Sequence, residues 1–343
     1  MSVDESPDWR PTASLDVLKQ RALLVGTLRK AFEQAGYWEV ETPILSHDIV
    51  VDAHLDPLIA EYFPDRLPSD PQSKGSALYL QTSPEFAMKR LLAAGATAIY
   101  QITHVMRNGE RGEWHNPEFT MAEWYCVGDN HHAQMDFTEQ LVRQVFASAE
   151  EFCPGAKLSD APFERLTYDQ AFERYAGCEV LGLEPEEFAD LASMHDVSPP
   201  EGLSPDDRDG WLTFLLSEIV EPELEQPTFL YDYPASQAAL AKVRDADPPV
   251  AERFELYFAG VELCNGYHEL TDADELLSRM KKQNQLRESH HARQLPESNR
   301  LLEAMQAGLP ACSGVALGVD RLIMLALGQS TIHQVMAFPF DRA

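Results

Sequence analysis

Apolar side chains recur at helical spacing between residues 15 and 35, and this pattern predicts a long amphipathic helix. Gly36 follows, and glycine commonly ends a helix. Residues 37–42 then predict a strand, which Pro43 stops because proline has no N–H to donate to a sheet. The first part of the chain is therefore expected to form a helix–strand–proline unit.

Two longer strands are predicted over residues 98–106 and 118–127, with a polar turn over residues 107–117 between them. Alternation places four side chains of the second strand on one face: Phe119, Met121, Glu123 and Tyr125. A glutamate among aromatic rings needs a partner if that face is buried. The pattern favours a pocket that stacks a ring and pairs with a cationic amine over plain core.

A hairpin is predicted where residues 253–258 and 261–265 form strands joined by Ala-Gly. A two-residue turn pairs Tyr257 with Glu262 and leaves Glu255 diagonal to Glu262 on the same face. Diagonal neighbours lie roughly 7–8 Å apart, so the two carboxylates could bracket one hard cation. Two solvated glutamates on an exposed hairpin are the alternative.

Residues 313–321 are rich in small side chains and are expected to open a helix that runs to residue 327 and stops at Gly328. Small residues allow a backbone to approach a ligand closely, and a helix N-terminus offers free N–H groups to an anion. Arg321 lies where its guanidinium could grip a phosphate. A buried helix start with an acidic cap is the alternative.

Shorter elements complete the prediction of an α+β fold. Residues 78–82 predict a strand, and Ser83-Pro84-Glu85 then begins a helix. Glu85 fits either ordinary pairing with the helix dipole or contact with a ligand amine. A loop is predicted over residues 65–75, and an extended segment over residues 227–234. A helix is predicted to begin at Asp272 and to run to about residue 291. Residues from about 153 to 225 predict an acidic helical insert in a single domain over residues 1–343.

Composition narrows the function classes. The formal net charge of −29 disfavours an extended grip on nucleic acid, which needs basic contacts to phosphates. No apolar run approaches the roughly 20 residues of a membrane span. Five widely spaced cysteines without a Cys-x-x-Cys pair fit a reducing, cytoplasmic setting. The pairs His131-His132 and His290-His291 lack metal-ligand spacing and are expected on the surface.

Three separated stretches together resemble the three motifs of a class II aminoacyl-tRNA synthetase in the lysine branch. They are the helix–strand–proline unit ending at Pro43, RNGERGEWHNPEFTMAEWY (residues 107–125) and GVALGVDR (residues 314–321). The hairpin stretch RFELYFAGVELCNGYHEL (residues 253–270) adds to the match. The resemblance implies an antiparallel sheet flanked by helices, and a homodimer formed around the first motif.

The first motif begins at residue 15, which leaves no room before it for the anticodon-binding barrel of a lysyl-tRNA synthetase. The chain therefore resembles the short paralogues that ligate (R)-β-lysine to elongation factor P. TSPEFAMKRLL (residues 82–92) and YDYPASQAALA (residues 231–241) are further matches. This implies an ATP-dependent ligase that forms an aminoacyl-adenylate and then an amide on a lysine of that protein, with ATP and Mg2+ and without tRNA.

The resemblance also implies a role for particular residues. Catalytic roles fall to Arg107 and Arg321. ATP contacts fall to Arg107, Glu110, His115, Asn116, Phe119, Glu262, Leu263, Gly318 and Arg321. Substrate contacts fall to Ser83, Pro84, Glu85, Glu123, Tyr125, Glu269 and Ala316. The resemblance assigns magnesium binding to Glu255 and Glu262.

Two departures bear on these roles. The class motif has glutamate two residues after its arginine, but here Gly109 occupies that place and Glu110 follows. Lysyl-tRNA synthetases have glycine where this chain has Ala316, so we expect Ala316 to influence the choice of amino acid. Two rival functions share the pattern: a stand-alone synthetase-like enzyme that charges tRNA, and a non-catalytic paralogue that senses an amino acid. The charge disfavours the first, and the retained arginines and glutamates disfavour the second.

Overall fold

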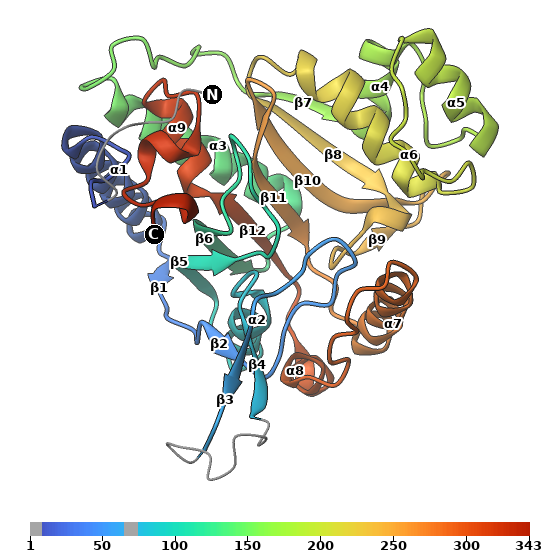
Figure 1. Cartoon of the computed structure of the whole chain (residues 1–343), viewed down its shortest axis with the longest axis horizontal. Helices are drawn as coiled ribbons and strands as arrows, with labels where there is room; N and C mark the ends of the chain where they lie inside the picture. The colour runs from blue at the N-terminus through green and yellow to red at the C-terminus, as the bar shows by residue number, and fades with distance from the viewer. Residues whose placement is uncertain (1–8, 65–74) are drawn as a thin grey trace.

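A central sheet organises the computed structural model, which describes residues 9–64 and 75–343 (Figure 1). Along the sheet the strands are β1 (Trp38–Glu39), β5 (Ala98–Met106), β6 (Glu118–Val127), β12 (Cys312–Gly318), β11 (Val261–His268), β10 (Val250–Phe258), β8 (Thr228–Pro234) and β7 (Glu164–Thr167). The short strand β9 (Val243–Arg244) pairs with β10. Pairing is antiparallel from β5 to β8, whereas the edge strands β1 and β7 pair in parallel. The predicted α+β fold is confirmed, and the antiparallel sheet is corrected at its edges.

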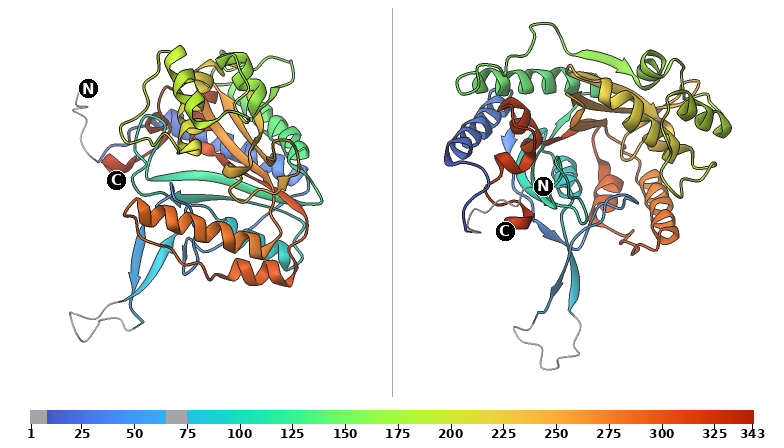
Figure 2. Two further views of the ribbon diagram at one scale, coloured as in Figure 1. Left: turned by 90° about the vertical axis from the view of Figure 1, so that its right-hand side faces the viewer. Right: turned by 45° about the horizontal axis from the view of Figure 1, so that its top comes forward.

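A smaller sheet of β2 (Leu45–Ser46), β4 (Ser76–Leu80) and β3 (Ile59–Tyr62) extends away from the central sheet (Figure 2). The predicted strand over residues 78–82 is β4, which begins and ends two residues earlier. Apart from Gly75, the loop predicted over residues 65–75 lies outside the described residues.

One face of the central sheet is apolar and is covered by α1 (Leu15–Gln34), α3 (His131–Ala149) and α9 (Val319–Ala326). Trp124 of β6, Leu317 of β12 and Leu256 of β10 are buried in this core. Because side chains alternate along a strand, the residues between them point to the opposite face. That opposite face carries Glu123 and Glu255.

Two further apolar clusters hold the remaining helices. One contains side chains of α2 (Glu85–Ala93), α7 (Ala273–Ser289) and α8 (Arg300–Gly308). The other contains α4 (Tyr168–Ala176), α5 (Pro185–Met194) and α6 (Arg208–Leu215) beside β8 and β10. The segment predicted as a helical insert therefore also contributes a strand, β7, to the central sheet. Its treatment as an insert in one domain stays a prediction.

Local signals explain where α1 and its strand end. The Ser14 side chain accepts a hydrogen bond from the Val17 N–H and caps α1, and Gly36 follows the helix with a φ of 84°. The strand predicted over residues 37–42 is only the two-residue β1. Val40 still donates to the Tyr100 carbonyl, but the chain then leaves the sheet edge before Pro43.

The helix predicted to open within residues 313–321 is confirmed as α9, but most of the glycine-rich stretch before it forms a strand, which corrects the prediction. Residues Cys312–Gly318 form β12, and α9 begins at Val319. Strand β12 pairs with both β6 and β11, so sheet pairing decides the conformation of a segment whose local pattern is ambiguous. The buried Asp320 then accepts from the Thr120 N–H at 2.6 Å and lies 2.6 Å from Arg21 of α1. One carboxylate thus ties together all three motif regions.

Candidate active site

Small residues of β12 form the floor of the polar face. Ala316 pairs with Glu123 on one side and with Asn265 on the other, so it lies at the centre of this face. A Cβ atom at Gly314 would lie 2.2 Å from the Tyr125 ring and 2.7 Å from a Glu269 carboxylate oxygen. Glycine at 314 therefore allows two polar side chains to lie directly across the strand.

Ser83, Glu123 and Tyr125 meet beside this floor. The Ser83 hydroxyl donates to one oxygen of Glu123 at 2.7 Å, and the Tyr125 hydroxyl donates to the other at 2.7 Å. Burial, together with the nearby Glu85 carboxylate, raises the pKa of Glu123 to about 7. Three of the residues that the resemblance assigns to the substrate are thus in direct contact.

Lys89, which the sequence reasoning missed, lies between two of the predicted substrate residues. Its ammonium group is 2.5 Å from Glu85 and 2.5 Å from Glu269, and the side chain is 1% exposed. Burial alone would lower the pKa of Lys89, but the Glu269 and Glu85 carboxylates outweigh it and raise the pKa. The spacing of Glu85 and Lys89, four residues apart on a helix, was a signal that could have revealed the pair.

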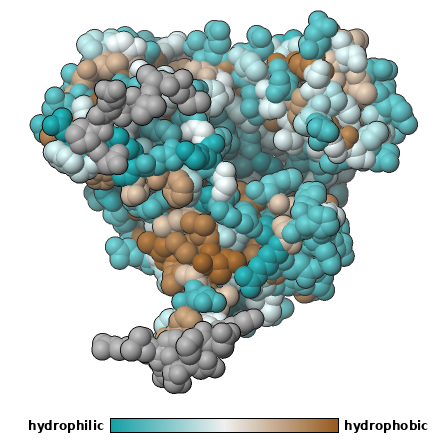
Figure 3. Space-filling view, viewed as in Figure 1, coloured by the Kyte–Doolittle hydropathy of each residue, from teal (hydrophilic) through white to brown (hydrophobic). Residues whose placement is uncertain are grey.

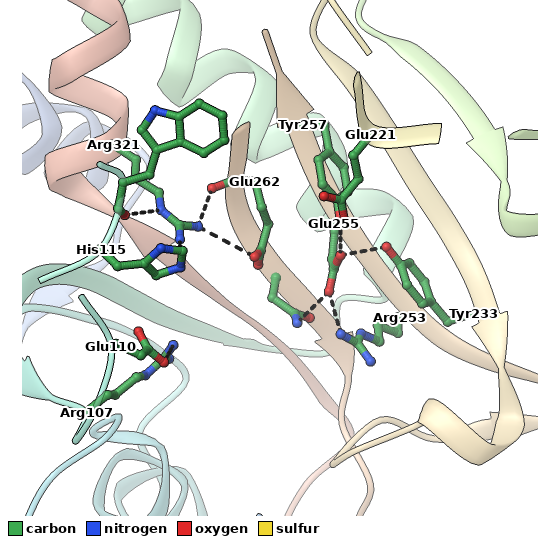
Figure 4. A network of polar contacts seen from close by, with 12 residues as sticks. Arg107, Glu110, His115, Glu221, Tyr233, Arg253, Glu255, Tyr257, Glu262 and Arg321 are labelled. Atoms are coloured by element: carbon green, nitrogen blue, oxygen red, sulfur yellow. Dashed lines mark hydrogen bonds and ion pairs between the residues drawn. The ribbon is translucent and has the colours of Figure 1, made fainter. Parts of the chain in front are cut away.

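Arg321 is held at the other end of the face (Figure 4). Its guanidinium donates to the backbone carbonyl groups of Trp114 at 3.1 Å and Glu262 at 2.8 Å, and to His115 Nε2 at 2.7 Å. Partial burial and the adjacent Arg321 lower the pKa of His115, so the imidazole is neutral and accepts this bond. These three contacts fix the orientation of the Arg321 guanidinium at this end of the face.

Arg107 occupies a second cationic position. Its Nε donates to the Thr82 carbonyl at 3.4 Å, and its guanidinium carbon lies 5.1 Å from the centre of the Phe119 ring. Gly109 has a φ of 81°, a conformation that favours glycine, and the turn brings Glu110 within 3.5 Å of Arg107. Glu110 therefore lies beside Arg107 although it is one residue later than the motif requires.

The predicted hairpin register is confirmed, since Tyr257 pairs with Glu262. A bulge shifts the register beyond this pair, so Glu255 pairs with Asn265. Glu255 is buried and accepts hydrogen bonds from Tyr233 and Tyr257 at 2.6 Å, from Asn265 at 3.0 Å and from Arg253. Glu262 is more open, with its side chain 40% exposed and Arg321 at 3.6 Å. Carboxylate oxygens suit Mg2+, and Glu262 has the more available pair.

Residues 6–342 match the family model of the tRNA synthetases of class II (D, K and N). The chain belongs to this family. It is 48% identical over 341 residues to the elongation factor P–(R)-β-lysine ligase of Vibrio cholerae, covering 98% of this chain and 99% of the relative. The ligase of the same name from Pasteurella multocida is 42% identical over 341 residues, covering 99% of each chain. The resemblance inferred from the motifs is confirmed.

Glu221, which the sequence reasoning missed, is a third carboxylate beside Glu255 and Glu262 (Figure 4). It accepts a hydrogen bond from Tyr257 at 3.1 Å, and Tyr257 also contacts Glu255. Burial and the Glu255 charge raise the pKa of Glu221 to about 7. It lies in the segment treated as an insert without chemistry, so no motif pointed to it.

Three other residues assigned from the family pattern are held by the protein itself. Pro84 lies directly before α2 as its N-cap residue. The Asn116 side-chain amide donates to the Glu118 carbonyl at 2.6 Å and accepts from the Phe340 N–H at 2.9 Å. Leu263 is the unpaired residue of the bulge, and its side chain is buried in the apolar core. Only the backbone of Leu263 is therefore available to a ligand.

Outside the class II site, the prediction of surface histidines is wrong for His131. His131 is 3% exposed, whereas His132, His290 and His291 are exposed. All five cysteines are free thiols. Within the described residues, no helix combines the length and the apolar character that crossing a membrane requires.

Proposed function

We propose that the chain activates (R)-β-lysine with ATP and transfers the lysyl group to a lysine side chain of elongation factor P. The observation that supports a lysine isomer as the substrate is the net charge of the pocket. Three carboxylates, Glu85, Glu123 and Glu269, surround the single ammonium of Lys89. When all three are ionised the pocket has two negative charges left over, which matches the two ammonium groups of a lysine isomer.

In the first step, a substrate carboxylate oxygen attacks the α-phosphorus of ATP. A new P–O bond gives the aminoacyl-adenylate, and the bond to pyrophosphate breaks. Arg107 and Arg321 hold phosphate oxygens and offset the charge that develops on them, so positioning and electrostatics supply most of the catalysis. Phe119 stacks the adenine, while His115, Asn116, Glu110 and the backbone at Leu263 and Gly318 line the nucleotide site.

Magnesium, when bound, neutralises charge on the phosphate oxygens. Glu262 would be its main protein ligand, with Glu255 beside it. The bonds that Tyr233 and Tyr257 donate to Glu255 fix that carboxylate in place. Glu255 therefore provides a second carboxylate beside Glu262 on this side of the site.

In the second step, a lysine amine of the protein acceptor attacks the mixed anhydride. An amide bond forms, the bond to AMP breaks and the amine loses a proton. Neither step requires a nucleophile from this chain. Ser83 and Glu85 would position the amino group nearer the reacting carboxylate, and Glu123, Tyr125 and Glu269 would recognise the distal ammonium.

The rival functions differ in the acceptor. The net charge of −29 works against binding a polyanionic tRNA, and the family pattern of arginines and glutamates works against a purely sensing role. The test is pyrophosphate exchange with (R)-β-lysine and L-α-lysine, followed by addition of elongation factor P or lysine tRNA and mass analysis of each acceptor. We expect exchange, and a lysyl adduct on the protein alone. An adduct on tRNA would favour the synthetase, and no exchange with either isomer would favour the sensor.

We also propose a cytoplasmic homodimer. Free thiols fit a reducing compartment. Exposed large apolar side chains gather on α1, β1 and the small sheet: Leu15, Leu23, Trp38, Ile44, Leu45, Ile59 and Tyr62. In Figure 3 an apolar area lies above the grey atoms, where Figure 1 labels β2, β4 and α2. Apolar patches of this kind favour burial against a second copy.

A further inference from the structure

A second polar cluster lies at the α3 side of the central sheet, away from the substrate floor. It joins His131, the first residue of α3, with Glu252 of β10 and His268 at the end of β11. One ligating atom from each residue lies within 4.8 Å of the other two. Neither histidine nor this glutamate has a role in the proposed reaction.

His131 is the unusual member of the cluster. Within the described part of the chain, neither of its ring nitrogens has a hydrogen-bond partner, although the side chain is 3% exposed. A buried polar group without a partner is costly, so the His131 ring calls for a water, an ion or a ligand.

Asp232 of β8 supplies a fourth inward-facing atom. Its Oδ1 lies 4.0 Å from His131 Nε2 and is also buried without a hydrogen-bond partner among the described residues. Its backbone φ is 58°, a rare conformation for aspartate that is often found at functional positions. Two independent unpartnered groups therefore point at the same small volume.

The surrounding charges are compatible with a cation. Arg244 binds the outer oxygen of Asp232 at 2.6 Å and lies 3.6 Å from the outer oxygen of Glu252. This leaves Asp232 Oδ1 and Glu252 Oε2, which contacts His268, on the inner side. Two carboxylates and one guanidinium leave one negative charge. Exposed His132, and Lys242 near Glu252, are the other basic groups around it.

We propose that His131, His268, Glu252 and Asp232 form a binding site for a divalent transition-metal ion, with Zn2+ as the probe. Two imidazoles with two carboxylates suit zinc or cobalt, whereas magnesium and calcium prefer oxygen ligands alone. Neighbouring ligands of tetrahedral zinc lie roughly 3.4 Å apart. The ligating atoms of His131, His268 and Glu252 lie within 4.8 Å of one another, and Asp232 Oδ1 lies 4.0 Å from His131, so the side chains must draw closer on binding. The ion would join α3 to three strands.

Zinc binding is measured by calorimetry on the full chain after chelator treatment, with excess magnesium present to occupy carboxylate-only sites. We expect one zinc per chain, and affinity at least tenfold weaker in both His131→Gln and His268→Gln. His132→Gln is the matched control, because it removes the adjacent exposed imidazole and should leave the affinity unchanged. Cobalt should give the strong visible absorption of a tetrahedral site in the wild type and in His132→Gln, and should not give it in His131→Gln or His268→Gln.

Thermal melting of the metal-free variants separates lost folding from lost binding. His268 is only partly buried, so His268→Gln keeps the test valid if His131→Gln does not fold. The proposal is overturned if the wild type binds no zinc, or if either variant folds and binds zinc as tightly as the wild type.

Discussion

At the scale of single residues, the substrate pocket is governed by one buried cation among three acids. Lys89 satisfies Glu85 and Glu269, while Ser83 and Tyr125 satisfy Glu123. Each acid therefore has a partner before any substrate arrives. This arrangement keeps the carboxylates oriented and makes the pocket sensitive to the protonation of Glu123.

Substrate affinity should depend on pH through Glu123. Its pKa is raised to about 7, so the carboxyl is protonated and neutral below that pH and ionised above it. An ammonium group binds better to the ionised form, so the KM for the lysine substrate should rise several-fold from pH 8 to pH 6. Kinetics in constant ionic strength measure this. In Glu123→Gln the KM should be higher throughout and should depend less steeply on pH. Some dependence should remain, because burial also raises the pKa of Glu269 in the same pocket. An equally steep profile in that variant would contradict the assignment.

Glu262→Gln should weaken the magnesium dependence of adenylation and leave the fold intact, because the side chain is partly exposed and removing its charge keeps its shape. Glu255→Gln should weaken the magnesium dependence and should also lower the melting temperature, since Arg253 would lose its buried carboxylate partner. Pyrophosphate exchange against magnesium concentration, with thermal melting alongside, distinguishes the two. Unchanged magnesium dependence in both variants would remove the metal assignment.

Ala316→Gly should shift the preference from (R)-β-lysine toward L-α-lysine by several-fold. Ala316 lies between Glu123 and Asn265 on the floor of the site, so its methyl group limits the space available to the substrate there. Discrimination by one carbon is typically about 1–3 kcal/mol, so preference and not exclusion is expected. The readout is the ratio of kcat/KM for the two isomers. A parallel change for both isomers would leave Ala316 with a packing role alone.

At the scale of elements, periodicity predicted α1, β5, β6 and the hairpin of β10 and β11 with little error. These elements are long or have a clear turn signal. The pattern failed where tertiary pairing decides: residues 312–318 became a strand because two neighbours pair with them. Partnerships across the sheet, such as Lys89 with Glu269 or the His131 cluster, join residues far apart in the chain, so spacing alone could not reveal them.

Glycines of β12 should differ sharply in tolerance. Gly314→Ala should lower stability by about 1–3 kcal/mol, because its Cβ would overlap the buried Tyr125 ring. Gly318→Ala is the matched control in the same strand: its nearest neighbour would be Arg321 at 3.6 Å, an ordinary contact. Denaturant unfolding of both variants measures the difference. Equal stability of the two would show that the strand shifts to make room.

At the scale of the whole molecule, the sheet separates two tasks. Its apolar face packs against α1, α3 and α9, and its polar face carries the proposed chemistry. Asp320 crosses between these layers, since it binds Thr120 of β6 and Arg21 of α1. The helix that presents exposed apolar side chains is therefore fixed directly to the strands of the site, so a second copy packed on α1 would also support the site.

Leu23 and Trp38 lie on α1 and β1, within the motif region where the homodimer is proposed. Leu23 is 57% exposed, and Leu23→Glu would place a charge in that contact, between two chains that already repel with a net charge of −29 each. Sedimentation at micromolar concentration should show a dimer for the wild type and a monomer for this variant. Met194→Glu is the matched control, because Met194 is 72% exposed on α5, an element outside the proposed interface, and should leave the dimer intact. A wild-type monomer would refute the dimer, and a dimer that survives Leu23→Glu but not Met194→Glu would move the interface to the α4–α6 side.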